Sequence, residues 1–213
     1  LKYPEPGLVK TRLAAEVGVE AATRLARHFA EQTLASVVSL DLPVEVCFAP
    51  VEREAAVRTW LGQGFVYQLQ QGADLGERMK NAFLAAFGRG AERVVLVGTD
   101  APDRPVEFLS EALVGLEEYE VVLGPALDGG YHLIAMSARN FASEAFCGIE
   151  WSTTQVLAQT LDALRRAGRS VQVLPPWRDI DDRAGLEDYL EGHPQAAALL
   201  ARSVQGNGGS HDE

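Results

Sequence analysis

The chain of 213 residues lacks the features of a membrane protein and of a nucleic-acid-binding protein. No apolar run approaches the ~18 residues that a membrane-spanning helix needs, and no secretory signal precedes the first loop. We therefore predict a cytoplasmic protein with no membrane partner. Lys and Arg number 19 against 30 Asp and Glu, which gives a formal net charge of −11. This charge opposes nucleic-acid binding, but a local basic loop or a divalent cation could still hold a small anionic ligand.

Cysteine is scarce as well. Cys47 and Cys147 lie far apart, without a Cys-x-x-Cys pair or a Cys/His cluster, which favours two buried free thiols over a disulfide or a metal site. The length and an apolar fraction of 47% suit one domain with its own core, which we predict over residues 1–202. Residues 203–213 are rich in polar and small residues and are predicted to be a disordered tail. An apolar strand upstream of Leu1 would be the natural lead-in to the first loop, so we expect the first strand to be truncated.

Helical and strand patterns alternate along the chain. The predicted helices span 19–38, 52–61, 74–87, 105–116, 152–167 and 183–201. The predicted strands span 44–49, 65–69, 93–97 (buried on both faces), 121–123, 131–136 and 171–174. Strands separated by helices indicate βαβ units and a parallel sheet, but only a turn separates the strands within 121–136. The predicted fold is a three-layer α/β/α sandwich around a mostly parallel, mixed sheet.

The first loop combines rigidity with positive charge. Pro6 and Gly7 belong to a turn whose backbone can come close to a ligand. The cations of this loop are Lys2, Lys10 and Arg12. Ammonium and guanidinium groups both suit phosphate oxygens, so the loop is a candidate phosphate site, with a solvated surface loop as the alternative.

Aspartates follow two of the predicted strands, at the end where open α/β sheets bind ligands. Asp100 follows the strand 93–97 and either holds a divalent metal on a diphosphate or braces the turn before Pro102. Asp179 and Asp181 lie two apart in an extended segment, so both can point to one side and share this metal. Helix capping by Asp181 or its neighbour Asp182 is the alternative, and we expect Asp103 to cap a helix.

A third acidic turn, Asp128-Gly129-Gly130, follows the strand 121–123. Its glycines leave space for a bulky ligand, and Asp128 could accept hydrogen bonds from sugar hydroxyls; a simple hairpin turn is the alternative. His132 beyond it is expected to be structural. Weaker candidates are Asp74 and Arg78 at a helix start, where Asp74 and Glu77 also form a capping box, and Tyr131 beside a sugar or acceptor. Trp151 either packs in the core, which is the default, or lines the same pocket. The segment Ser152–Gln155 is predicted to be a second capping box.

Six short motifs occur in a fixed order along the chain. They are Lys-x-Pro-x-Pro-Gly-x-Val-Lys-Thr-Arg-Leu, Asp-Leu-Gly-Glu-Arg-Met, Gly-Thr-Asp-Ala-Pro, Gly-Pro-Ala-x-Asp-Gly-Gly-Tyr, Trp-Ser-Thr and Asp-Ile-Asp. Over residues 2–190 this order resembles a bacterial family of glycosyltransferase-A-like proteins, long of unknown function, with members assigned to arsenosugar biosynthesis. That family is related more distantly to molybdenum-cofactor and 2-phospholactate nucleotidyltransferases.

The resemblance implies the glycosyltransferase-A (nucleotide-diphospho-sugar transferase) fold, with the first loop near the nucleotide phosphates and Mg²⁺ or Mn²⁺ near Asp100. Gly98-Thr99-Asp100 stands where glycosyltransferases carry an Asp-x-Asp motif, so Asp179 or Asp181 is needed as a second ligand. We therefore predict metal-dependent glycosyl transfer from a nucleotide diphosphate sugar to a small-molecule acceptor, with Asp128 as a general base. One alternative is a guanylyl- or cytidylyltransferase-like reaction between a nucleoside triphosphate and a phosphorylated small molecule. The other is a non-catalytic nucleotide- or sugar-binding protein.

Overall fold

The computed structural model of the protein describes residues 1–201, so the tail predicted over 203–213 lies outside the described residues. The helices are α1 (Thr11–Val17), α2 (Val19–Val38), α3 (Glu54–Leu61), α4 (Leu75–Gly88), α5 (Glu107–Gly115), α6 (Val156–Arg166), α7 (Arg183–Gly192) and α8 (Pro194–Ala201), with 3₁₀ turns η1 (Val51–Arg53) and η2 (Ser143–Phe146). The strands are β1 (Glu45–Phe48), β2 (Val66–Leu69), β3 (Arg93–Val97), β4 (Val121–Pro125), β5 (Tyr131–Ser137) and β6 (Val171–Val173).

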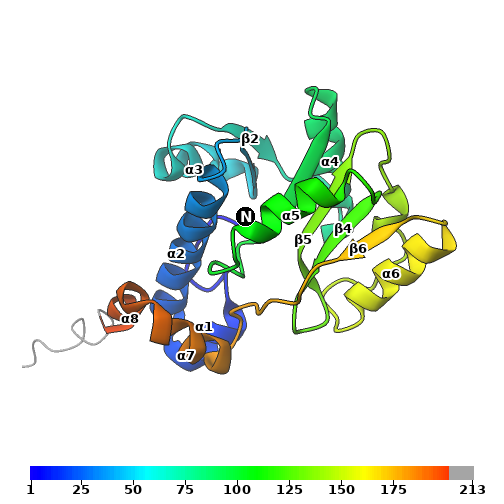
Figure 1. Cartoon of the computed structure of the whole chain (residues 1–213). Coiled ribbons are helices and arrows are strands. Elements are labelled where there is room, and N and C mark those ends of the chain that lie inside the picture. The colour runs from blue at the N-terminus through cyan, green and yellow to red at the C-terminus, as the bar shows by residue number, and fades with distance from the viewer. Residues whose placement is uncertain (202–213) are drawn as a thin grey trace, which may run out of the picture.

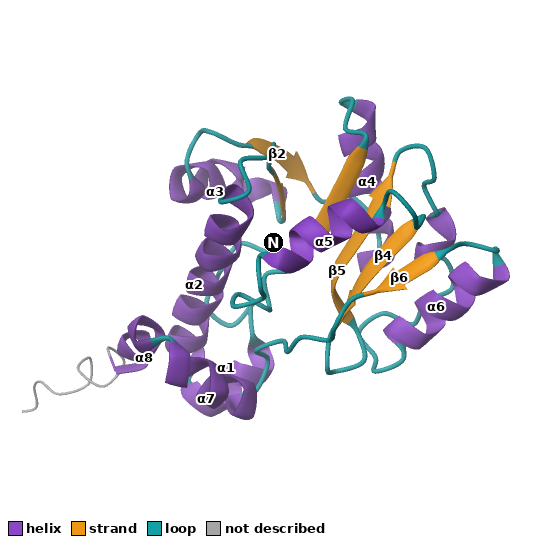
Figure 2. Cartoon of the chain, in the orientation of Figure 1, coloured by secondary structure: helices purple, strands orange, loops and turns teal. Residues whose placement is uncertain are grey.

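Four strands form the main sheet in the order β3-β5-β4-β6 (Figure 2). β5 runs antiparallel to both of its neighbours, and β4 pairs with β6 in parallel, so β3, β4 and β6 share one direction. β1 and β2 form a separate parallel pair. The short turn between β4 and β5 allows their antiparallel pairing. The predicted mixed sheet is therefore confirmed.

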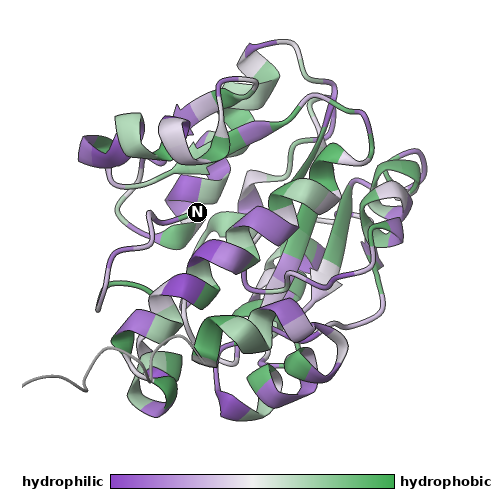
Figure 3. Ribbon diagram, turned by 90° about the vertical axis from the view of Figure 1, so that its left-hand side faces the viewer, coloured by the Kyte–Doolittle hydropathy of each residue, from purple (hydrophilic) through white to green (hydrophobic). Residues whose placement is uncertain are grey.

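Each face of the main sheet is covered by helices (Figure 1). Alternate side chains of a strand point to opposite faces, so Val121 and Leu123 of β4 pack on one side and Val122 on the other. The first side also carries Phe83 of α4 and Leu164 of α6, whereas the second carries residues of α5. In Figure 3 the strands of the main sheet are largely hydrophobic, whereas the helices carry both hydrophobic and hydrophilic residues. This arrangement confirms the predicted α/β/α layers.

The N- and C-terminal helices form a second apolar cluster beside the sheet (Figure 1). Leu13 of α1, Leu25 and Phe29 of α2, and Leu186 and Tyr189 of α7 are all buried in it. The cluster brings the basic first loop, which ends at α1, against the segment that precedes α7. Two ends of the chain therefore contribute to one side of the molecule.

Several predictions from the pattern of residues are wrong in detail. β3 is only half-buried because it lies at the edge of the main sheet. Both cysteines are free thiols as predicted, but Cys47 is only half-buried and Cys147 is exposed on the turn after η2. Helix α6 begins at Val156 rather than at Ser152, because Thr153 Oγ1 donates to Glu150 O and holds a turn there. The short helix α1 was not predicted. Within residues 1–201, the helices are all too short or too polar to cross a membrane.

Candidate functional site

A cleft of about 690 Å³ opens where the carboxyl ends of β3, β4 and β6 meet the first residues of β5. Its other wall comes from the first loop, α2 and the start of α4. Eleven of the predicted site residues line it: Lys2, Lys10, Arg12, Arg78, Asp100, Asp128, Gly130, Tyr131, Trp151, Asp179 and Asp181. The structure therefore brings together residues that are up to 179 positions apart in sequence (181 − 2), because the sheet gathers the strand ends at one edge.

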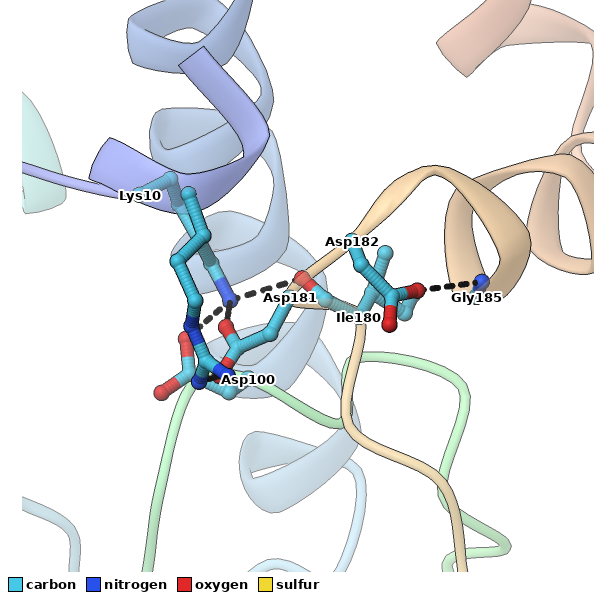
Figure 4. A network of polar contacts seen from close by, with 7 residues as sticks. Lys10, Asp100, Ile180, Asp181, Asp182 and Gly185 are labelled. Atoms are coloured by element: carbon cyan, nitrogen blue, oxygen red, sulfur yellow. Dashed lines mark hydrogen bonds and ion pairs between the residues drawn. The ribbon is translucent and has the colours of Figure 1, made fainter. Parts of the chain in front are cut away.

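Lys10 is the centre of a network of polar contacts in this cleft (Figure 4). Its ammonium donates to Asp181 Oδ1 at 2.8 Å and to the carbonyl oxygen of Ile180 at 2.9 Å, and it forms an ion pair with Asp100. Arg12 pairs with the other oxygen of Asp181 at 2.9 Å. The backbone supports this arrangement, because the Ile180 amide donates to the carbonyl oxygen of Asp100 at 2.8 Å. Although burial lowers it, Asp100 and Asp181 together raise the pKa of Lys10 above its ordinary value.

Asp179 is the most perturbed acid of the cleft. Burial, followed by the charges of Asp100, Asp128 and Asp181, raises its pKa from 3.8 to about 7, and Lys10 offsets only part of this. The oxygen Oδ1 of Asp179 is buried without a hydrogen-bond partner among the described residues. A carboxyl group in this state is suited to accept a cation or a donor from a ligand, and such perturbed groups gather at functional sites.

The remaining predicted cations line the cleft from the first loop and from α4. The guanidinium of Arg12 is 73% exposed in spite of its contact with Asp181. Arg78, on the first turn of α4, is exposed and donates to the carbonyl oxygen of Gly72 at 3.3 Å. Lys2 is exposed and donates to the carbonyl oxygen of Leu8 at 2.9 Å. These three side chains keep donors for an anionic ligand.

Four predicted residues do not line the cleft. Pro6 and Gly7 lie in an exposed turn of the first loop, where Gly7 has a φ of +76°. Asp74 caps α4, since its side chain accepts from the Glu77 amide at 2.8 Å as the capping box predicts. Gly129 has a φ of +92° and packs against the loop before α6 rather than facing the cavity.

The turn after β4 and the loop before α6 form one wall. Asp128 is exposed, and its Oδ1 accepts from the Gly130 amide at 2.9 Å. Trp151 packs edge-to-face on Tyr131 with the ring centroids 6.5 Å apart. The same indole lies against Gly76, where a Cβ atom would come within 2.5 Å of the ring. The absence of a side chain at position 76 therefore fixes Trp151 between α4 and β5, where it both packs and lines the cleft.

Sequence reasoning missed two buried polar side chains at the cleft, His132, which lines it, and Arg104. His132 is only 4% exposed and stacks on Phe108, and burial, with Arg104 as the second cause, lowers its pKa to about 4. Arg104 is also 4% exposed, and burial lowers its pKa to about 10. Arg104 and His132 lie in separate segments of the chain, so no local sequence pattern indicates that both are buried here. The prediction of a structural His132 agrees with its packing.

Asp103 does not cap a helix as predicted. Helix α5 begins four residues later, at Glu107, so Pro105 lies before the helix rather than in its first turn as predicted. The Asp103 carboxylate is 9% exposed and accepts from Trp177 Nε1 at 3.0 Å and from Arg178 Nη2 at 2.8 Å. Asp182 caps α7 through the Gly185 amide at 2.9 Å, while Asp181 remains in the cleft.

The acidic residues suit a hard divalent cation in chemistry, since carboxylates are the ligands that Mg²⁺ prefers. The unpartnered oxygen of Asp179 and the half-exposed carboxylate of Asp100 both belong to the cleft. In residues 1–201, however, no set of three or more His, Cys, Asp or Glu side chains is arranged to hold a metal by itself. A cation would therefore need oxygen ligands from a bound substrate as well.

Comparisons with known proteins agree with this architecture. A crystal structure from Desulfovibrio desulfuricans G20, provisionally described as a nucleotide-diphospho-sugar transferase, is 39% identical with a TM-score of 0.89, over 95% of this chain and 92% of that one. The 4-diphosphocytidyl-2C-methyl-D-erythritol synthase of Anaerococcus prevotii DSM 20548 is 14% identical with a TM-score of 0.57, over 76% of this chain and 89% of that one. Rv0371c from Mycobacterium tuberculosis H37Rv is 18% identical with a TM-score of 0.51, over 76% and 83%. These likenesses confirm the nucleotide-diphospho-sugar transferase fold. Curated protein sequences give no match.

The sequence itself matches one family of bacterial proteins over residues 18–153. The matched region includes α2, the main part of the sheet and the loops with Asp100 and Asp128. The match spans well over half of the chain, and the relative from D. desulfuricans extends the similarity over nearly all of it. The protein belongs to the family described as "Uncharacterized protein conserved in bacteria (DUF2064)".

Proposed function

We propose that the protein is a transferase for a nucleotide-activated substrate, and that it transfers a glycosyl group from a nucleotide diphosphate sugar to a small acceptor. The observation that carries this proposal is one cleft lined both by exposed cations of the first loop and α4 and by aspartates that follow the strand ends. The cations would bind a diphosphate, and the aspartates would bind a sugar and the hydroxyl group of its acceptor. The relative at 39% identity, provisionally described as a nucleotide-diphospho-sugar transferase, supports the same substrate class.

The exposed cations would bind the diphosphate. Arg12 and Arg78 present planar guanidinium groups, which bind phosphate oxygens in pairs, and Lys2 adds a point charge. In a chain with a net charge of −11, this local group is what makes binding of an anion favourable. The same contacts would stabilise the negative charge that develops on the departing diphosphate.

The acidic wall would orient the sugar and the acceptor. Asp128 is exposed beside Gly130, where its carboxylate could accept a hydrogen bond from a hydroxyl and take its proton as a general base. Tyr131 and Trp151 form an aromatic surface next to this turn, of the kind that packs against a sugar ring. Asp128 is therefore the residue that we expect to contact the acceptor.

Metal dependence is part of the proposal. Asp100 and Asp179 would hold Mg²⁺ or Mn²⁺ together with phosphate oxygens of the substrate. Such an ion, when bound, would neutralise charge on the leaving diphosphate. We propose Asp181 as a further metal ligand, which requires its carboxylate to break its contacts with Lys10 and Arg12.

A thermal-shift screen tests the proposal. Nucleoside diphosphates, nucleoside triphosphates and nucleotide sugars would each be added with and without Mg²⁺ or Mn²⁺, and a ligand at 100 times its Kd should stabilise by about 2.7 kcal/mol. A metal-dependent shift with one nucleotide sugar supports glycosyl transfer and identifies the donor. No shift with any nucleotide would overturn the nucleotide-using transferase itself.

Product analysis separates the proposed reaction from its rivals. Glycosyl transfer releases a nucleoside diphosphate, whereas nucleotidyl transfer to a phosphorylated substrate releases pyrophosphate. The same basic wall would serve both reactions, so the released product decides between them. Binding without turnover of any acceptor, with a lasting shift in stability, would favour the non-catalytic nucleotide- or sugar-binding protein.

A further inference from the structure

The ammonium of Lys10 lies in a coordination sphere of oxygens. It contacts Asp100 and Asp181 through their carboxylates and Ile180 through its carbonyl group, from two segments that meet at the cleft (Figure 4). Carboxylate and carbonyl oxygens are also the ligands of Mg²⁺ and related hard cations. The ammonium thus stands among the oxygens that a metal ion at this place would use.

Burial of its side chain and contact with an aromatic ring hold Lys10 in this position. Its side chain is 6% exposed, whereas those of Asp100 and Asp181 are 50% and 31% exposed and reach the cleft. The ring of Phe29 lies 5.5 Å from the ammonium and favours a cation there. The backbone of Lys10, at the N-cap of α1, has a φ of 47°, a left-handed conformation that is uncommon outside glycine. This geometry holds the Lys10 ammonium among the carboxylate oxygens when no ligand is bound.

A resident ammonium changes what the acidic residues can bind. A divalent cation next to it would meet a positive charge at short range, and both carboxylates already share their charge with Lys10. We infer that Lys10 acts as an internal cation that closes the acidic site to free divalent metal, so that metal enters only with ligands that compensate for Lys10. The inference rests on the proposed function only in taking a divalent metal as the competing ion.

The inference predicts a gain of binding when the ammonium is removed. Lys10→Met keeps an unbranched apolar side chain against Phe29 and removes the ammonium from the oxygens of Asp100 and Asp181, while Arg12 still contacts the second oxygen of Asp181. The matched control is Lys80→Met, which makes the same chemical change on α4 outside the cleft. Lys10→Arg keeps the positive charge and should behave as the wild type does. Asp100→Asn combined with Lys10→Met tests whether any new site uses the Asp100 carboxylate.

The experiment is a titration of each purified protein with Mn²⁺ alone, followed by the electron paramagnetic resonance signal of free Mn²⁺. We expect weak binding by the wild type, Lys80→Met and Lys10→Arg, at least tenfold tighter binding by Lys10→Met, and loss of that gain in the double variant. Tight Mn²⁺ binding by the wild type would overturn the inference even if Lys10→Met does not fold. So would a folded Lys10→Met that binds no better than the wild type. Because no nucleotide is present, failure here is separate from failure of the proposed function.

Discussion

Gly129 and Thr154 lie so close together that a Cβ atom on Gly129 would come within 2.2 Å of the Thr154 carbonyl oxygen. The carbonyl group of Gly129 also accepts a hydrogen bond from the Leu157 amide at 2.9 Å. These backbone contacts join the turn after β4 to the loop before α6 and to the first turn of α6. The position of Asp128 relative to Trp151 therefore depends on a glycine that does not itself line the cleft.

We predict that Gly129→Ala destabilises the protein more than a matched glycine substitution does. Gly90→Ala is the control, since Gly90 has a φ of +94° against +92° for Gly129 but has open space around it. Each substitution places alanine in a left-handed conformation at a cost of about 1–2 kcal/mol, and only Gly129→Ala adds a clash with backbone. Urea unfolding should show a loss at least about 2 kcal/mol larger for Gly129→Ala. Equal losses would mean that the two loops separate easily.

A second prediction concerns the buried carboxylate of Asp103. Asp103→Ala leaves Arg178 and Trp177 without an acceptor in a place that is 9% exposed, so we expect a loss of about 2–4 kcal/mol in the free energy of unfolding. Asp103→Asn keeps one acceptor oxygen and should lose less. Asp188→Ala changes an exposed aspartate on α7 and should stay within about 0.5 kcal/mol of the wild type. An Asp103→Ala variant as stable as the Asp188→Ala control would contradict this role.

The fold could be predicted from the sequence to a large extent, because the spacing of apolar residues along a short segment indicates whether that segment is a helix or a strand. The helix 19–38 and the mixed sheet follow from such patterns, and Asp74 caps α4 as expected. The edge position of β3 could not be predicted, because it depends on which strands pair, and its half-burial follows from that pairing. The turn at Ser152–Gln155 resembles a capping box in sequence, and only its contacts with Glu150 show that the helix begins later.

The candidate site was predicted as a set of residues but not as a network. Placing ligands beyond the strand ends correctly selects Asp100, Asp128 and Asp179. The contact between Lys10 and Asp181, 171 positions apart, depends on the packing of α1 against α7. Nothing in the sequence near Lys10 indicates that, without a ligand, its ammonium forms ion pairs with carboxylates of the protein itself. The roles of these residues toward a ligand therefore stay predictions, as does the link to arsenosugar biosynthesis.

The raised pKa of Asp179 predicts a stability that depends on pH. Burial first, and then Asp100, Asp128 and Asp181, raise this pKa from 3.8 to about 7, so the folded protein keeps a proton here that the unfolded chain releases. Its contribution to stability is complete below the unfolded pKa and is lost as the pH rises through about 7. Asp179→Asn removes this titration. Relative to the wild type, the variant should therefore gain about 2–3 kcal/mol between pH 5 and pH 8, where one pKa unit corresponds to about 1.4 kcal/mol.

Chemical unfolding at several pH values, in the presence of a chelator, measures this effect. Asp188→Asn is the control, since it replaces an exposed aspartate and should follow the wild type at each pH. A difference between Asp179→Asn and the wild type that stays constant from pH 5 to pH 8 would show that Asp179 is ionised throughout. In that case a water molecule would be the hydrogen-bond partner of the buried Asp179 oxygen.

The last prediction separates ligand binding from folding on a single helix. Arg78 lines the cleft from the first turn of α4, while Lys80, two residues on, does not line it. Arg78→Gln should weaken nucleoside diphosphate binding about tenfold or more, because a charge-assisted hydrogen bond contributes about 1.5–3 kcal/mol. Lys80→Gln should leave the affinity unchanged, and both variants should unfold within about 0.5 kcal/mol of the wild type. Isothermal titration calorimetry gives the affinities and urea unfolding gives the stabilities. If both substitutions weaken binding equally, general electrostatic attraction by α4 explains the loss, and Arg78 has no specific contact with the phosphates.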